Sequence, residues 1–252
     1  MDNLIITQMP DWVKITLNRP AVKNALNTAV LAALAAALTI CAADAKCRAV
    51  LICGAAGNFA AGADVSEIVD KTSAKAAVDP RKTHWAAIRA FPKPLMVAVD
   101  GYALGAGFEL ALIADFMVVG ADAKLGLPES NLGLIPGAGG GQRLLALAGR
   151  ARASRLVMLG EVIDATTAYN WGIAGWMADG PALPLATEIV ARLCNRAPLA
   201  MITAKAALVA GAEAALAFDV ERAGFERLMD SADKAEGLAA FKARRKAVFT
   251  GK

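Results

Sequence analysis

The sequence predicts an α/β fold with a helical C-terminal region, and two observations lead to this prediction. In the first half of the chain, continuous apolar runs occur at Ala49–Cys53, Leu95–Val99 and Phe116–Val119. Such runs are typical of strands buried on both faces, and a helical pattern over residues 107–113 separates the last two. Beyond Arg143, apolar residues recur with helical spacing and strand-like runs are scarce. The chain therefore combines a mixed core with a helical second half.

Alternation and capping signals predict the N-terminal elements. Ile5–Gln8 and Val13–Leu17 alternate apolar and polar side chains on either side of a Met-Pro-Asp turn, which predicts a hairpin. Asn27 can cap the alanine- and leucine-rich helix that follows it. The apolar stretch Ala29–Ala43 is too short and too rich in alanine to cross a bilayer, which takes about 20 apolar residues. We therefore expect a core-packed helix and no membrane partner.

Apolar-periodic segments predict a series of helices in the second half of the chain. They are Arg150–Leu159, Ala165–Trp171, Leu185–Cys194, Pro198–Ala210, Ala214–Leu228 and Ser231–Phe249. This region is expected to pack against the core or against a neighbouring subunit.

Composition and charge argue against several classes of function. The 252 residues carry a formal net charge of +4, which is mild and dispersed, so no nucleic-acid partner is expected. The cysteines form no CxxC pair, and the sole histidine, His84, has no second ligand near it in sequence. We therefore expect reduced core cysteines and no metal site. Because no signal-peptide pattern opens the sequence, the predicted location is cytoplasmic.

Three glycine-rich segments are the candidates for ligand binding, at residues 54–64, 101–109 and 133–142. Their glycines can serve tight turns and close packing, or they can bare backbone N–H groups toward a ligand. No segment fits GxGxxG, GxxxxGK[ST] or Gly-x-Ser-x-Gly. These mismatches argue against a dinucleotide site, a P-loop and a serine-hydrolase elbow.

Two glutamates stand next to these segments. Residues 105–107 open a predicted helix, whose first N–H groups lack internal partners and lie at the positive end of the helix dipole. A carbonyl oxygen that gains negative charge would be stabilised there, and a donor from a second loop would complete an oxyanion hole. Glu109 lies about one turn further on, and Glu129 follows Pro128 at another turn. An arbitrary glutamate is more often exposed or salt-bridged, but the apolar neighbours of Glu109 predict a raised pKa.

These segments resemble those of the crotonase superfamily, and of enoyl-CoA hydratase in particular. The matching segments are Leu17–Pro20, Asn24–Asn27, Phe59–Asp64, Gly101–Leu110, Gly126–Glu129, Gly133–Gly140, Gln142–Arg143, Ala197–Pro198, Glu236–Gly237, Phe241 and Arg244–Lys246. They cover nearly the whole chain in the family's order. The resemblance implies a core of repeated ββα units over residues 1–195 and a helical trimerisation region over residues 196–252. It also implies a homotrimer or a dimer of trimers.

The resemblance further implies roles for single residues. The backbone N–H groups of Ala63 and Ala106 would hold the thioester oxygen. Glu109 would activate a water molecule and Glu129 would deliver a proton to Cα, so that the two carboxyls divide the acid and base work. Gly137 would place an N–H near the water or near Glu129. Position 106 is often glycine in the family, but only its N–H is needed, so the hole should survive the added methyl group.

Coenzyme A would arrive as part of an acyl-CoA substrate, so no separate cofactor is expected. The residues implied in binding it are Lys23, Ala60, Ala61, Gly62, Phe241 and Arg244. For Lys23 and Arg244, an ordinary exposed charge is an equal alternative. Residues 69–84 are expected to line the acyl pocket and match no family pattern, which leaves the acyl group open.

The presence of both glutamates favours a hydratase that adds water to a trans-2-enoyl-CoA. Two alternatives stay open. One is another crotonase-type acyl-CoA reaction, such as double-bond isomerisation or the hydration or dehydration of a specialised acyl-CoA. The other is RNA binding, as in some relatives, which the modest charge does not support.

Overall fold

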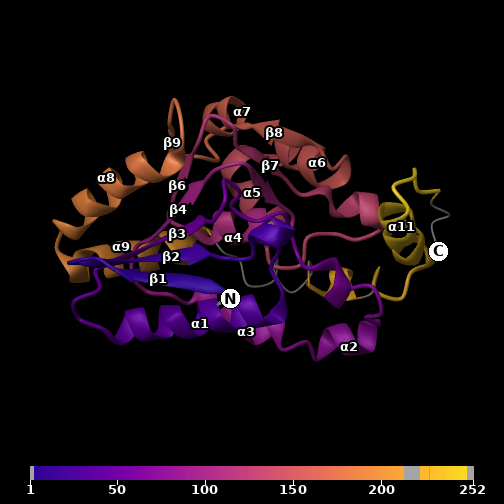
Figure 1. Cartoon of the computed structure of the whole chain (residues 1–252), viewed down its shortest axis with the longest axis horizontal. Coiled ribbons are helices and arrows are strands. Elements are labelled where there is room, and N and C mark those ends of the chain that lie inside the picture. The colour runs from indigo at the N-terminus through magenta and orange to yellow at the C-terminus, as the bar shows by residue number, and fades with distance from the viewer. Residues whose placement is uncertain (1–2, 213–221, 227, 249–252) are drawn as a thin grey trace.

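The core of the protein is a six-stranded sheet with the order β1-β2-β3-β4-β6-β9 (Figure 1). The structure is a computed structural model and describes residues 3–212, 222–226 and 228–248. The strands are β1 (Leu4–Gln8), β2 (Trp12–Leu17), β3 (Ala49–Gly54), β4 (Leu95–Val99), β6 (Phe116–Val119) and β9 (Trp176–Met177). β1 runs antiparallel to β2, and the remaining neighbours are parallel. The predicted hairpin and the three predicted buried strands are confirmed.

The structure also contains a second sheet of three short strands, which was not predicted from the sequence. It consists of β5 (Tyr102–Leu104), β7 (Lys124–Gly126) and β8 (Val162–Asp164) in the order β5-β7-β8. β5 pairs with β7 in parallel, and β7 pairs with β8 antiparallel. Strands of three residues are too short to show an alternating pattern.

Helices connect and cover the strands. They are α1 (Thr28–Ala43), α2 (Ser73–Ala77), α3 (Arg81–Arg89), α4 (Ala106–Ile113), α5 (Gly140–Ala148), α6 (Arg150–Met158), α7 (Ala165–Asn170), α8 (Ala182–Cys194), α9 (Pro198–Ala212) and α11 (Ala232–Lys242). Three 3-10 helices add to them: η1 (Pro20–Val22), η2 (Val65–Glu67) and η3 (Pro128–Leu132). Within the described part of the chain, no helix is both long and apolar enough to span a membrane.

Most of the predicted helices agree with the structure. The Asn27 side chain accepts a hydrogen bond from the N–H of Val30, as expected of a helix cap. The helix expected over Ala214–Leu228 falls partly on residues 213–221 and 227, which lie outside the described residues; residues 222–226 are helical. The last predicted helix, Ser231–Phe249, is shorter in the structure, because α11 ends at Lys242 and Phe249 lies outside the described residues. The trimerisation role of residues 196–252 stays a prediction.

The central strands are apolar on both faces because helices cover both faces. In β3, Val50 and Ile52 point into one apolar core, while Leu51 and Cys53 point into another. Figure 1 shows α1 and α3 on one side of the sheet and α8 on the other. Full burial of such side chains contributes about 1.5–3 kcal/mol each, which explains the continuous apolar runs in the sequence.

A third, smaller apolar cluster lies apart from the sheet. It consists of Ile68, Ala76, Leu134, Phe225 and Met229, and we call it the cap cluster. Its members come from three segments that are distant in sequence. Three of its members, Ile68, Leu134 and Phe225, line the cavity described next.

Candidate active site

The first two glycine segments meet directly at the start of α4. Ala60 forms an isolated β-bridge with Ala103, which precedes that helix. A Cβ on Gly107 would lie 2.1 Å from the carbonyl oxygen of Ala60, so only glycine permits this approach. The N-terminus of α4 is therefore pressed against the loop that contains residues 60–63.

This contact brings the two predicted oxyanion donors into one region. Ala106 is the first residue of α4, where a helix leaves its N–H groups without internal acceptors. Ala63 lies in a short parallel bridge with Leu26, in which the N–H of Leu26 donates to Gly62 and the N–H of Asp64 donates to Leu26. Among the described residues, neither the Ala63 N–H nor the Ala106 N–H donates a hydrogen bond to the protein. Both amides are thus available to a ligand.

Glu109 is held by backbone amides rather than by side chains. Its side chain is buried, and Oε1 accepts hydrogen bonds from the N–H groups of Ala138 (2.7 Å) and Gly140 (3.0 Å). Gly140 is the first residue of α5, so the positive end of that helix faces the carboxylate. Burial raises the pKa of Glu109, and the amides oppose this only in part. The direction agrees with the prediction made from its apolar neighbours.

Glu129 approaches from the opposite loop, in η3. Its Oε1 lies 3.0 Å from the place that a Cβ of Gly105 would occupy. Gly105 has a φ of 49°, a region that favours glycine, and it immediately precedes α4. The carboxyl of Glu129 therefore lies beside the backbone that presents the Ala106 N–H.

Both glutamates and both amides line one cavity of about 220 Å³. Seven predicted site residues besides Glu109 line it as well. They are Ala61, Gly62, Ala63, Ala106, Glu129, Gly137 and Phe241. Most of the remaining lining is apolar, with Leu26, Ile68 and Trp85 among its members. The arrangement can hold an apolar acyl group with two carboxyls and two N–H donors at one end.

Three predicted CoA-binding residues lie outside the cavity lining. Ala60 is fully buried in the bridge to Ala103. The carbonyl oxygen of Lys23 accepts from the N–H of Ala61, while its Nζ lies 4.5 Å from the centroid of the Tyr102 ring. Arg244 is exposed just after α11. Their roles in CoA binding stay predictions.

Some residues that shape the site were not assigned a role from the sequence. The N–H groups of Ala138 and Gly140 hold Glu109, and Arg143 donates to the carbonyl of Ala138 at 3.1 Å. The run of glycines at 137–141 was the available signal for a backbone cradle. Arg81 and Arg222 also line the cavity, and nothing in their sequence context marked them.

Comparison with known proteins shows the family to which the chain belongs. Residues 11–252 match the family described as enoyl-CoA hydratase/isomerase. The chain is 41% identical to the 2,3-dehydroadipyl-CoA hydratase of Escherichia coli (strain K12), with all of both chains covered. It is 36% identical to a probable mitochondrial enoyl-CoA hydratase of Arabidopsis thaliana, over 95% of this chain and 81% of that protein.

Solved structures give the same result. An enoyl-CoA hydratase from Mycobacterium avium subsp. paratuberculosis superposes with a TM-score of 0.87 at 30% identity, with 99% of each chain covered. A carnitinyl-CoA hydratase from Mycobacterium avium superposes with a TM-score of 0.88 at 31% identity over the same shares. The mixed α/β fold predicted from the sequence is thereby confirmed. The chain belongs to the enoyl-CoA hydratase/isomerase family.

Proposed function

We propose that the protein adds water across the double bond of a trans-2-enoyl-CoA thioester. The observation that carries the proposal is that Glu109 and Glu129 line one cavity with Ala63 and Ala106, whose N–H groups donate to no described residue. An isomerase needs a group that moves a proton between carbons, whereas hydration needs two groups that act on one water. Two carboxyls on one cavity suit the second requirement.

The two amides would stabilise the charge that forms during addition. As the water oxygen bonds to Cβ, the electron pair of the double bond moves toward the thioester oxygen. The N–H groups of Ala63 and Ala106 would donate to that oxygen, and because neither donates to a described residue, no protein hydrogen bond among these residues has to break first. Removing one donor from such a hole costs about 10²–10³ in rate in other enzymes.

The two carboxyls would divide the proton transfers. Glu109 would accept a proton from the water, and burial makes its carboxylate a stronger base than an exposed one. Glu129 would supply a proton to Cα, so that one O–H of the water is replaced by new C–O and C–H bonds. The backbone cradle of Ala138 and Gly140 fixes the orientation of Glu109 during this step.

Coenzyme A binding is part of the proposal. Ala61, Gly62 and Phe241 line the same cavity as the glutamates. Phe241 is 60% exposed, which suits a ring at the mouth of the cavity where a long ligand leaves it. Lys23 and Arg244 are the proposed contacts to the phosphates of coenzyme A.

The direct test is turnover of crotonyl-CoA and longer 2-enoyl-CoA thioesters, followed by the loss of enoyl absorbance. The expected result is hydration to the 3-hydroxyacyl product. Absence of turnover over a range of chain lengths would contradict the proposal. Faster consumption of a 3-enoyl-CoA than of the matching 2-enoyl-CoA would favour isomerisation instead.

A further inference from the structure

The cavity contains two cations for which the proposed hydration has no use. Among the described residues that line it, four are ionisable: Glu109, Glu129, Arg81 and Arg222. Arg81 begins α3 and is 7% exposed, and Arg222 belongs to the helical residues 222–226. A plain alkyl chain has no atom that can accept a hydrogen bond from a guanidinium. Their presence on this cavity therefore needs a reason.

Each arginine belongs to a cluster with more positive than negative charge. Nε and Nη2 of Arg81 donate to Oδ2 of Asp79 at 2.9 and 2.8 Å, and Lys71 pairs with the same oxygen. Although burial acts to raise the pKa of Asp79, the hydrogen bonds from Arg81 and Lys71 hold it below its ordinary value, so Asp79 is ionised. Two cations thus share one anion, which leaves a net charge of +1.

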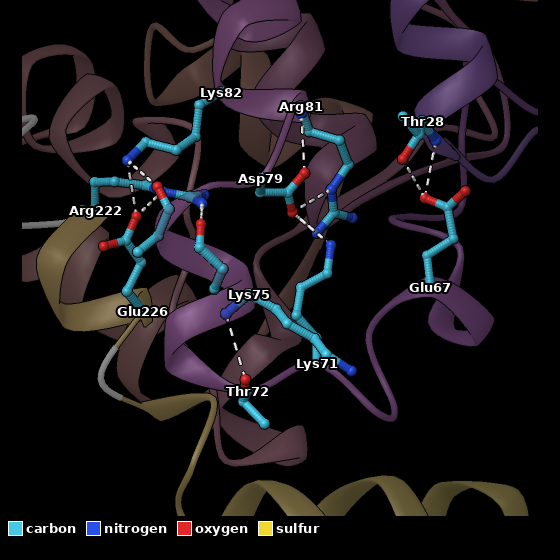
Figure 2. Close-up of polar contacts among 12 residues, drawn as sticks. Thr28, Glu67, Lys71, Thr72, Lys75, Asp79, Arg81, Lys82, Arg222 and Glu226 are labelled. Carbon is cyan, nitrogen blue, oxygen red and sulfur yellow. Dashed lines mark hydrogen bonds and ion pairs between the residues drawn. The ribbon is translucent and has the colours of Figure 1, made fainter.

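The second cluster repeats this imbalance. Nε of Arg222 and Nζ of Lys82 both contact Oε1 of Glu226 at 3.0 Å. Figure 2 shows the two clusters, with Lys82, Arg222 and Glu226 in one and Lys71, Asp79 and Arg81 in the other. Four cations therefore face two anions across these six residues. Within the described chain, Nη1 of neither guanidinium donates a hydrogen bond to the protein.

Phe225 connects this charge to the glutamate end of the cavity. The Cζ atom of Arg222 lies 5.0 Å from the centroid of the Phe225 ring. A Cβ on Gly137 would lie 2.8 Å from the same ring, so the ring packs against the backbone next to Ala138. Ala138 in turn donates to Glu109. A single aromatic ring thus separates the loop that holds Glu109 from the guanidinium of Arg222.

We propose that Arg81 and Arg222 bind a carboxylate at the far end of the acyl group. The substrate class would then be a 2-enoyl-CoA of a dicarboxylic acid, with the thioester at the two amides and the second carboxylate at the arginines. This inference rests on the proposed hydration. Arginine suits the task because its planar donors match a carboxylate. The Escherichia coli relative is named for a thioester of this kind, since a 2,3-dehydroadipyl group ends in a carboxylate.

The competing explanation is that the two arginines serve only to stabilise the fold. Arg222 also donates from Nη2 to the carbonyl of Ala76 at 2.8 Å, and Arg81 braces the turn that precedes α3. The chain offers matched controls, because Lys71 and Lys82 pair with the same carboxylates yet do not line the cavity. Replacing either lysine weakens the ion pairs of its cluster but removes no cation from the cavity lining.

The experiment compares 2,3-dehydroadipyl-CoA with trans-2-hexenoyl-CoA, which has the same number of acyl carbons and no second carboxylate. The readout is the ratio of their kcat/KM values. In the unmodified protein we expect the dicarboxylic substrate to be favoured. Arg81→Gln and Arg222→Gln should each lower the ratio about 10- to 100-fold, as expected for a lost charge-assisted hydrogen bond. Arg222→Lys should retain part of the preference, because it keeps the charge.

The control variants Lys71→Gln and Lys82→Gln should leave the ratio within about twofold of the unmodified protein, because neither lysine lines the cavity and neither substitution removes a cation from the proposed carboxylate site. If the arginine variants lose activity on both substrates equally, the arginines are structural and the inference is overturned. Equal or better turnover of hexenoyl-CoA by the unmodified protein would also overturn it while leaving the proposed hydration intact. Failure to hydrate either thioester, and crotonyl-CoA as well, would overturn both proposals.

Discussion

Two sides of one cavity are built in different ways. The glutamate side consists of α4, η3 and residues 134–140, and backbone amides hold its key carboxyl. The arginine side consists of residues 65–85 and 222–226, and ion pairs between side chains hold it together. A group held by main-chain amides keeps its place when side chains change, whereas a group held by ion pairs is altered by a single substitution. Under the two proposals, the reaction belongs to the side held by main-chain amides, and substrate selectivity belongs to the side held by ion pairs.

The largest effect should follow from removing a carboxylate on the glutamate side. Glu109→Gln and Glu129→Gln should each lower kcat for 2-enoyl-CoA hydration by about 10³, because a positioned acid or base contributes about 10²–10⁴. The affinity for coenzyme A, measured by calorimetry, should change little. Glu161→Gln, on an exposed pair with Arg155, is the matched control. A rate close to that of the unmodified protein in either variant would refute the assignment.

On the arginine side, the largest effect should be on stability. The Asp79 carboxylate is 1% exposed and bonds to both Arg81 and Lys71. Breaking a buried pair typically costs about 3–5 kcal/mol, so Asp79→Asn should lower the free energy of unfolding by roughly 3 kcal/mol in urea titrations. Its folded pKa lies below the ordinary value, so the contribution is present above pH ~3.9 and is lost as the pH falls through the folded pKa.

The exposed pair between Glu236 and Arg245 provides the comparison for this variant. Glu236→Gln should change the unfolding midpoint far less, because exposed pairs contribute little. Equal destabilisation by the two substitutions would show that burial does not decide the strength of the arginine side.

The two sides of the cavity also differ in how far they could be predicted from the sequence. Glycines and the glutamates beside them form local patterns, so the two glutamates and the main strands could be predicted from the sequence, whereas the amides of Ala138 and Gly140 that hold Glu109 could not. The arginine side depends on contacts between residues far apart, such as Lys82 with Glu226, which lie 144 positions apart. Neither periodicity nor a motif reports such a pair. The short strands β5, β7 and β8 were missed for the separate reason that three residues show no period.

A smaller effect should follow from shifting a carboxylate without removing it. A Cβ on Gly140 would lie 2.8 Å from Cγ of Glu109, so Gly140→Ala must displace that side chain. We expect kcat to fall about 10- to 100-fold, in line with the cost of small misplacements in other active sites. Gly180→Ala is the control, because its added methyl group meets nothing within 4 Å. Unchanged kcat in Gly140→Ala would mean that the backbone cradle does not position Glu109.

The smallest effect should be a pH-dependent gain in stability. Burial raises the pKa of Glu109, so the folded protein holds this proton more tightly than the unfolded chain does. The unmodified protein therefore loses stability as the pH rises from about 4.3 through the folded pKa, whereas Glu109→Gln does not. The variant should have a higher Tm at pH 8 and a similar Tm at pH 4. A Tm difference independent of pH would contradict this.

The cap cluster has a consequence for biosynthesis. Phe225 covers Gly137, and Arg222 bonds to Ala76, so this wall of the cavity is completed by residues that leave the ribosome well after Ile68 and Leu134. Until then Ile68 and Leu134 lack the partner that shields them from water. A nascent chain, or one cut short by a premature stop codon before residue 222, would therefore expose the apolar side chains of Ile68 and Leu134. Exposed apolar surface of this kind promotes aggregation and is bound by chaperones.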